Sequence, residues 1–231
     1  DFVHIEDCTR EGITIFETST EEITGVFEPP HRVSVSETEL LKKKCETLIE
    51  KSGWLVLSGS TPHSELDFLY EGLIESTDRT KCRVVLDSYG EAFKLGIGAK
   101  PFMVKPNVKE FEQMFGVHLA SERAVLDQLE WVEAMGVSLA MLTDTEKPFY
   151  ASYLGRRWRV TPPHVHTVNP VGSGDAFVAA TIYGFLGQWE IERILKFATA
   201  AGAVNASRWA VVDVTLQEVE SLALGVALQA I

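Results

Sequence analysis

A glycine-punctuated stretch at residues 168–180 carries the side chain with the clearest chemistry in this chain. It reads Val-Asn-Pro-Val-Gly-Ser-Gly-Asp-Ala-Phe-Val-Ala-Ala and predicts a tight turn that opens directly into a helix. Gly172 and Gly174 would let the N–H groups of residues 172–175 point at one spot, where the helix dipole adds positive potential. Asp175, on the rim of that spot, could take a proton from a hydroxyl group while the amides stabilise a transferring phosphoryl group. The alternative is that Asp175 only caps the helix.

A second place with possible chemistry is the segment Lys-Pro-Asn-Val-Lys-Glu at 105–110, which follows a predicted strand and opens a helix. Asn107 and Glu110 lie one turn apart, so both side chains could approach one metal–phosphate cluster. The same spacing is that of a capping box, which explains the pair without any ligand. Further on, Asn205 continues an apolar helix stripe, and a buried amide needs polar partners of some kind.

These residues require a scaffold, and the composition describes one. The chain has 231 residues, 45% of them hydrophobic and 23% charged, which is typical of a globular protein with a substantial core. No apolar run is long enough to span a membrane, and the net charge of −12 argues against nucleic acid or an anionic membrane as partner. Cys8, Cys45 and Cys82 show neither a disulfide framework nor a zinc spacing, which favours a reducing cytoplasm.

The hydrophobic periodicity predicts an α/β fold. Residues 1–30 resemble a small β segment with short strands at 2–5, 13–16 and 23–27, and residues 31–231 form the α/β core. Within the core, strands are predicted at 54–57, 83–87, 102–105 and 137–143, with a hairpin at 148–161. Helices are predicted at 36–52, 64–77, 90–96, 107–115, 122–135, 175–187, 190–208 and 215–228. Ligands of such sheets bind beyond the carboxyl ends of the strands.

The 168–180 stretch resembles the C-terminal signature of the ribokinase-like (PfkB) carbohydrate kinases, in the form found in the tagatose-6-phosphate kinase and 1-phosphofructokinase branch. The resemblance implies a three-layer α/β/α fold with a mostly parallel sheet, helices on both faces and a small β lid. It also implies ATP and Mg²⁺ as cofactors and a sugar or sugar phosphate as substrate, of the tagatose-6-phosphate or fructose-1-phosphate type. Asp175 would then be the catalytic base, and Gly172, Ser173 and Gly174 would hold the transferring group.

The same resemblance extends to other motifs. Asn107 and Glu110 match the family's Asn-x-x-Glu motif, in which Glu110 would act on magnesium indirectly through water. Thr143 begins the nucleotide loop, and Asn205 lies in the helix that carries an adenine-pocket element in the family. On the substrate side, the resemblance implies roles for Arg10, Ser58 and Ser60.

Several positions depart from the family pattern. Thr145 and Pro148 replace both glycines of the nucleotide loop, and Gly12 stands where the family has an Asn after its Thr-Arg pair. His63-Ser64 follows the Ser-Gly-Ser-Thr-Pro turn in place of the family's glycine. These changes motivate an alternative function, a catalytically weak or inactive relative that binds a ligand or a partner.

Residue 1 aligns well inside the family's fold, just before the Thr-Arg pair. We therefore expect the chain by itself to show no appreciable sugar phosphorylation. We also expect it to form a homo-oligomer, or to pair with another segment through an uncovered sheet edge near residues 54–57 and 83–87, because buried-type strands do not stay uncovered.

Overall fold

The computed structural model describes residues 1–17, 19–20 and 22–231, so positions 18 and 21 of the β segment predicted at 1–30 lie outside the described residues. Residues 1–104 form one compact unit and residues 105–231 another. Across the described ranges, no helix has the length and apolar character that crossing a membrane requires.

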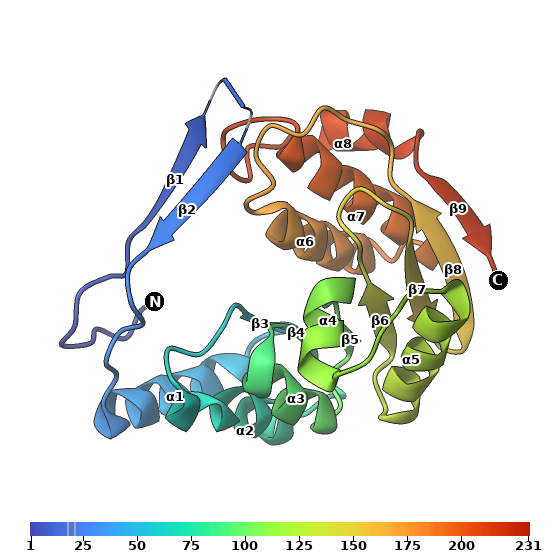
Figure 1. Cartoon of the computed structure of the whole chain (residues 1–231). Coiled ribbons are helices and arrows are strands. Elements are labelled where there is room, and N and C mark those ends of the chain that lie inside the picture. The colour runs from blue at the N-terminus through green and yellow to red at the C-terminus, as the bar shows by residue number, and fades with distance from the viewer. Residues whose placement is uncertain (18, 21) are drawn as a thin grey trace. The chain divides into compact units, whose positions relative to one another are not determined.

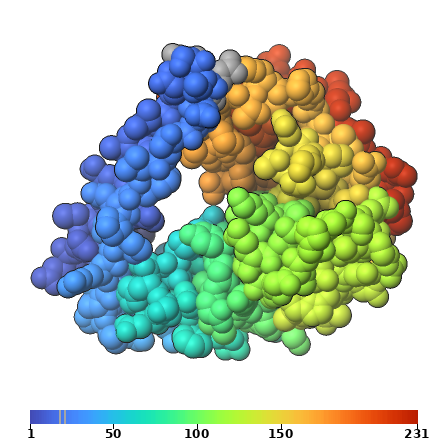
Figure 2. Space-filling model, in the orientation of Figure 1, coloured from blue at the N-terminus to red at the C-terminus, as the bar shows by residue number. Residues whose placement is uncertain are grey.

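The first unit begins with a two-stranded antiparallel hairpin, made of β1 (Gly12–Glu17) and β2 (Glu22–Phe27) (Figure 1). Ile13 pairs with Val26, and both side chains are more than half exposed. Figure 2 shows both strands, in blue, at the molecular surface. The strands predicted at 13–16 and 23–27 are confirmed, whereas the one at 2–5 is wrong. That short apolar run pairs with no strand among the described residues, and it remains outside regular structure.

The rest of the first unit alternates helices and strands as the periodicity predicts. Its elements are α1 (Val35–Ile49), β3 (Trp54–Ser58), the 3-10 turn η1 (Ser64–Leu66), α2 (Phe68–Ser76), β4 (Arg83–Asp87), α3 (Gly90–Gly98) and β5 (Met103–Val104). Strands β3, β4 and β5 are parallel, with Val56 opposite Val85 and Val85 opposite Met103. Val85 is fully buried, while Val56 on the outer strand is 42% exposed. The uncovered edge therefore belongs to β3 alone, and β4, also expected there, lies between two strands.

The second unit contains α4 (Val108–Phe115), α5 (Glu122–Ala134), β6 (Leu139–Leu142), β7 (Phe149–Tyr153), β8 (Arg156–Thr161), α6 (Ser173–Leu186), α7 (Ile191–Ala206), α8 (Leu216–Ala223) and β9 (Ala227–Ala230). Strands β6 to β8 form an antiparallel meander, which confirms the hairpin predicted at 148–161, and β9 pairs antiparallel with β8 (Figure 1). The helix predicted at 215–228 is too long. It ends at Ala223, and the last residues pair with β8, because an available strand edge outweighs weak local helix preference.

The core of the second unit joins this meander to α6. Phe149 meets Phe177 edge to face with ring centroids 5.9 Å apart, and Tyr153 meets Phe185 at the same distance. Helices α6 and α7 pack closely through small residues, and a methyl group on Gly184 would lie only 2.7 Å from Ile194. This packing fixes the amino end of α6 against the carboxyl end of α7.

Candidate active site at the amino end of α6

The turn before α6 has a conformation that only glycine adopts readily. Gly172 has φ of +79°, and α6 begins at the next residue without a side-chain cap. A methyl group in place of its hydrogen would lie 2.5 Å from Cγ1 of Val211 and 3.2 Å from Cγ2 of Val212. Both the backbone conformation and the neighbouring loop therefore require glycine at position 172.

Two asparagines hold this turn in place. Asn169 is buried, its Nδ2 donates to the Trp209 carbonyl at 3.0 Å, and its Oδ1 accepts from the Val171 N–H at 3.1 Å. The amides of residues 168 and 169 both donate to the Ala206 carbonyl at the end of α7. The turn is thus attached to α7 and to the loop after it.

Asn205 completes the attachment and is fully buried. Its Nδ2 donates to the Val171 carbonyl at 2.8 Å and to Ser173 Oγ at 3.0 Å. Its Oδ1 accepts from the Val212 N–H at 2.6 Å. Because both amide donors and the carbonyl oxygen have partners inside the protein, the side chain holds the turn in position. The adenine-pocket role of Asn205 stays a prediction.

The hydrogen bonds of the turn select which amides can face an anion. The Ser173 N–H donates back to the Pro170 carbonyl at 3.1 Å, and the Ala176 N–H donates to the Gly172 carbonyl at 2.9 Å. The amides between them are those of Gly174 and Asp175, in the first turn of an uncapped 14-residue helix. Asp175 is exposed there. The amino end of α6 therefore combines positive electrostatic potential, from its amides and its dipole, with one carboxylate.

Lys105 is the residue that the sequence reasoning left out of the site. It is only 8% exposed, and its Nζ lies 3.4 Å from where a methyl group on Gly174 would be. A buried ammonium group beside the amino end of a helix creates a strong preference for an anion. The available signal was a lysine at the end of a predicted strand, within the Lys-Pro-Asn segment already singled out.

Asn107 and Glu110 form the capping box of α4. Asn107 Oδ1 accepts from the Glu110 N–H at 2.8 Å, and Glu110 Oε2 accepts from the Asn107 N–H at 2.9 Å. Thr143 lies beside this helix start, because its carbonyl accepts from the Val108 N–H at 2.8 Å. The structure therefore brings Asn107 and Thr143 together in a parallel bridge.

In the loop after Thr143, threonine occupies position 145, where the family pattern has glycine. Thr145 has φ of +48°, in the left-handed region that glycine adopts freely and a β-branched residue rarely does. Lys147 stabilises the loop by an ion pair with Asp144 at 3.3 Å and by donating its N–H to the Asp144 carbonyl. The backbone thus keeps a glycine-type conformation although threonine occupies it.

The remaining predicted site residues belong to the first unit. Ser58 ends β3, and its carbonyl accepts from the Tyr70 hydroxyl at 3.1 Å, which fixes the start of the turn. Ser60, two residues on, is exposed. Arg10 Nε donates to the Glu28 carbonyl at 2.8 Å, and its guanidinium lies 5.8 Å from the centroid of the Phe27 ring.

Among the residues described, no three His, Cys, Asp or Glu side chains are grouped so that they could hold a metal ion. A magnesium ion at this site would therefore need phosphate oxygens and water for most of its coordination, which is its usual habit with nucleotides.

Comparison with known proteins gives a consistent picture. A family model described as pfkB family carbohydrate kinase matches residues 1–213. Tagatose-6-phosphate kinase of Staphylococcus epidermidis is 27% identical over 216 residues, covering 89% of this chain and 66% of the relative. The 1-phosphofructokinase of Vibrio cholerae is 27% identical over 216 residues, covering 90% of this chain and 65% of the relative. The chain thus spans just under two thirds of the length of these relatives.

Solved structures show the same fold. The tetrameric inhibited form of phosphofructokinase-2 from Escherichia coli matches with a TM-score of 0.83 at 21% identity, covering 96% of this chain and 72% of that one. At this level of identity the likeness shows the fold alone, and it confirms the ribokinase-like α/β class that the sequence predicts.

Proposed function

Because the chain belongs to the PfkB carbohydrate kinase family, we propose that it phosphorylates a sugar phosphate with ATP at the amino end of α6. One observation is the main support for this proposal. The buried Lys105 ammonium lies beside Gly174, at an uncapped helix end whose first turn contains the Asp175 carboxylate. Anion stabilisation and a proton acceptor thus occur within one turn of helix.

The residues fit ATP through its phosphates. Lys105 and the Gly174 and Asp175 amides would hold the phosphate oxygens, since positive groups at a helix end favour negative charge. The start of α4 and Thr143, which lie against each other, would border the same nucleotide. Bound there with magnesium, ATP would supply the phosphoryl group.

The chain's own residues then account for the proton and the charge. The Asp175 carboxylate accepts the proton of the sugar hydroxyl as that oxygen bonds to phosphorus and the bond to the leaving phosphate breaks. Lys105 and the helix amides stabilise the negative charge that passes from one side of the phosphoryl group to the other. Asn169 and Asn205 keep the amides in position through the hydrogen bonds described above.

The names of the relatives suggest the substrate class. They are a tagatose-6-phosphate kinase and a 1-phosphofructokinase, so we propose a phosphorylated hexose with a free primary or secondary hydroxyl as acceptor. The outer strand β3 and the exposed apolar hairpin of β1 and β2 support self-association as part of the proposal, because such surfaces are covered in stable proteins.

The test is a comparison of Asp175→Asn with Asp127→Asn, an exposed aspartate on α5 paired with Arg123. In a preparation that turns over a hexose phosphate, Asp175→Asn should lower turnover at least ~100-fold with unchanged ATP affinity. Asp127→Asn should leave turnover unchanged. Normal turnover in Asp175→Asn would remove this carboxylate from the mechanism and, with it, the proposed site.

A second candidate function is ligand binding without catalysis, and the strained Thr145 conformation is the observation that favours it. Replacement of a loop glycine by threonine blocks close approach of a ligand to the backbone. This candidate predicts that ATP–Mg²⁺ binds, measured by calorimetry, while no hexose phosphate on a panel is phosphorylated. Phosphorylation of any of these sugars would exclude it.

A further inference from the structure

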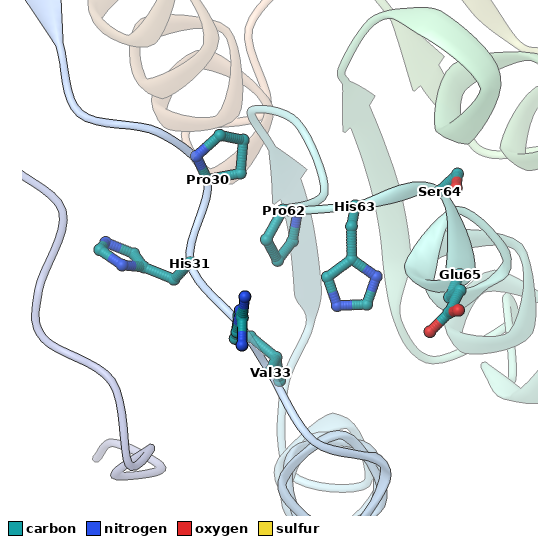
Figure 3. Close-up of a pocket in the computed structure, with 8 residues that line it drawn as sticks. Pro30, His31, Val33, Pro62, His63, Ser64 and Glu65 are labelled. Carbon is teal, nitrogen blue, oxygen red and sulfur yellow. The ribbon is translucent and has the colours of Figure 1, made fainter.

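The first unit contains a pocket of about 520 Å³ between the segments 30–33 and 62–65 (Figure 3). The His31 ring points away from His63 in this view, and its Nδ1 lies 3.5 Å from the Asp7 carboxylate. The two imidazoles therefore do not converge on one ligand. By contrast, a polar network of the second unit, at the carboxyl end of α7, reaches the α6 turn directly.

Arg208 closes the short loop of residues 208–213 that follows α7. Its Nη1 donates to the Asp213 carbonyl, and its backbone N–H donates to the Asn205 carbonyl at 3.3 Å. Its Nη2 donates to Glu218 Oε1 at 2.8 Å. The side chain is only 28% exposed, and its Nε is buried. One guanidinium group thus joins both ends of the loop to α8.

Glu218 is itself held by the amino end of α8. Its Oε2 accepts from the Thr215 N–H at 3.0 Å and from the Thr215 hydroxyl at 2.7 Å. The hydroxyl oxygen in turn accepts from the Glu218 N–H, which completes a capping box. An isolated ion pair at the surface contributes little to stability. This pair is different, because the end of a helix fixes the carboxylate and the carboxylate orients Arg208.

The middle of the loop 208–213 makes the contacts with the α6 turn. The Trp209 carbonyl accepts from Asn169 Nδ2 at 3.0 Å. The Val212 N–H donates to Asn205 Oδ1 at 2.6 Å. These are the two asparagines that hold the turn, so a displacement of the loop would release one bond of each.

The loop is not held by burial of its apolar side chains. Val211, which packs over Gly172, and Val212 are each about half exposed. Val212 also has φ of +58°, in the left-handed region that a β-branched residue rarely adopts. A conformation of this kind persists only where the surrounding bonds impose it. The bonds that Arg208 makes at the two ends of the loop do so here.

We propose that Arg208, oriented by Glu218, is a positioning residue for phosphoryl transfer, and that it acts by holding the loop 208–213 against the α6 turn. The inference rests on the proposed function for the reaction, whereas the link from Arg208 to the turn involves no substrate. Donors that stabilise a transferring group must stay aligned, so a loosened turn lowers the rate of transfer more than it lowers substrate affinity.

Hydrogen exchange of the full chain tests the link without any ligand. Arg208→Met keeps most of the side-chain length and removes the donors. The Val212 and Val171 amides, which donate to Asn205 and Asn169, should then exchange at least about 10-fold faster.

Arg157→Met is the matched control. Its guanidinium is 26% exposed and pairs with Glu133 at 2.9 Å, so it has comparable burial in the same unit but joins β8 to α5. It should leave the exchange of the Val212 and Val171 amides unchanged.

Kinetics in a preparation that turns over a hexose phosphate tests the consequence for the reaction. Arg208→Met should lower kcat at least about 10-fold and leave KM for the hexose phosphate within about 2-fold. Arg157→Met should change neither. Adding Glu218→Gln to Arg208→Met should lower kcat no further, since Glu218 acts through Arg208. An additional loss in that double variant would overturn the role given to Glu218.

The remaining outcomes separate this inference from the proposed function. Unchanged amide exchange in Arg208→Met would overturn the inference and leave the proposed function intact. Faster exchange with unchanged kcat, or an equal fall of kcat in Arg157→Met, would also overturn it. Normal turnover in Asp175→Asn would overturn the proposed function, while the exchange result would still decide whether Arg208 holds the turn.

Discussion

Gly172→Ala tests whether the turn before α6 is as constrained as its geometry indicates. The substitution has two costs that can be separated. A non-glycine residue at φ of +79° costs about 1–2 kcal/mol. The new methyl group would lie 2.5 Å from Val211 Cγ1, and relief of such overpacking costs about 1–3 kcal/mol. We expect Gly172→Ala to lower the free energy of unfolding by about 2–5 kcal/mol.

Two further variants separate the costs. Gly174→Ala is the matched control, because its methyl group would meet only Lys105 Nζ, at an ordinary 3.4 Å, and should change stability by less than about 1 kcal/mol. Val211 is half exposed, so Val211→Ala by itself should be mild. In the double variant with Gly172→Ala, it should recover the stability lost to overpacking. Only the backbone cost of about 1–2 kcal/mol should then remain.

The assay is urea denaturation followed by tryptophan fluorescence, since Trp131, Trp158, Trp189 and Trp209 all lie in the second unit. Hydrogen exchange of the Ala176 amide, which donates to the Gly172 carbonyl, reports the turn itself. Unchanged stability in Gly172→Ala would refute the geometry. Absence of any recovery in the double variant would refute the assignment of the clash to Val211.

Three other perturbations have definite expected results. Asn205→Ala should lower the free energy of unfolding by roughly 1–3 kcal/mol in urea, because it leaves the groups it joined without partners, and an unchanged midpoint would contradict its positioning role. Thr145→Gly should raise stability by up to about 1 kcal/mol, since relief of the left-handed strain exceeds the extra chain entropy of glycine; a Thr145→Ala control should not gain. Arg208 and Thr215 lower the pKa of Glu218 from 4.5 to about 2, so the stability it contributes is present above pH 4.5 and lost as pH falls toward 2. Glu218→Gln should therefore flatten the acid-unfolding curve in that window, and an unchanged curve would argue against the pairing.

Helix caps and turns could be predicted where the interacting residues lie close together in the sequence. Asn107 with Glu110 forms the predicted capping box, and α4 begins at Val108, within one residue of its predicted start. Ser34 with Glu37 forms a second capping box, and α1 begins at Val35, one residue before its predicted start. The turn at Gly172 was predicted for the same reason. Its neighbours Val211 and Val212 were not, since they lie about forty residues further on and are brought there only by the packing of α7.

Structural features that depend on residues far away in the sequence could not be predicted from it. Ala227–Ala230 has no strong strand composition, and it becomes a strand because the edge of β8 is available to it. The segment 2–5 has strand-like composition but pairs with no strand in the part of the chain that the structure describes. Lys105 was visible as a lysine after a strand, but its burial beside Gly174 follows from tertiary packing.

The attachment of the α6 turn to residues 205–212 has a consequence for biosynthesis. The hydrogen bonds that join the turn to Asn205, Ala206 and Trp209 come from chain made more than thirty residues later. Because closing such a loop costs entropy before the contacts repay it, the turn should form late, after the carboxyl end of α7 has left the ribosome. The first unit, made earlier, can fold while this part is still being synthesised. Nascent chains arrested before residue 205 should therefore lack protection of the Ala176 amide, and those arrested well beyond 213 should have it.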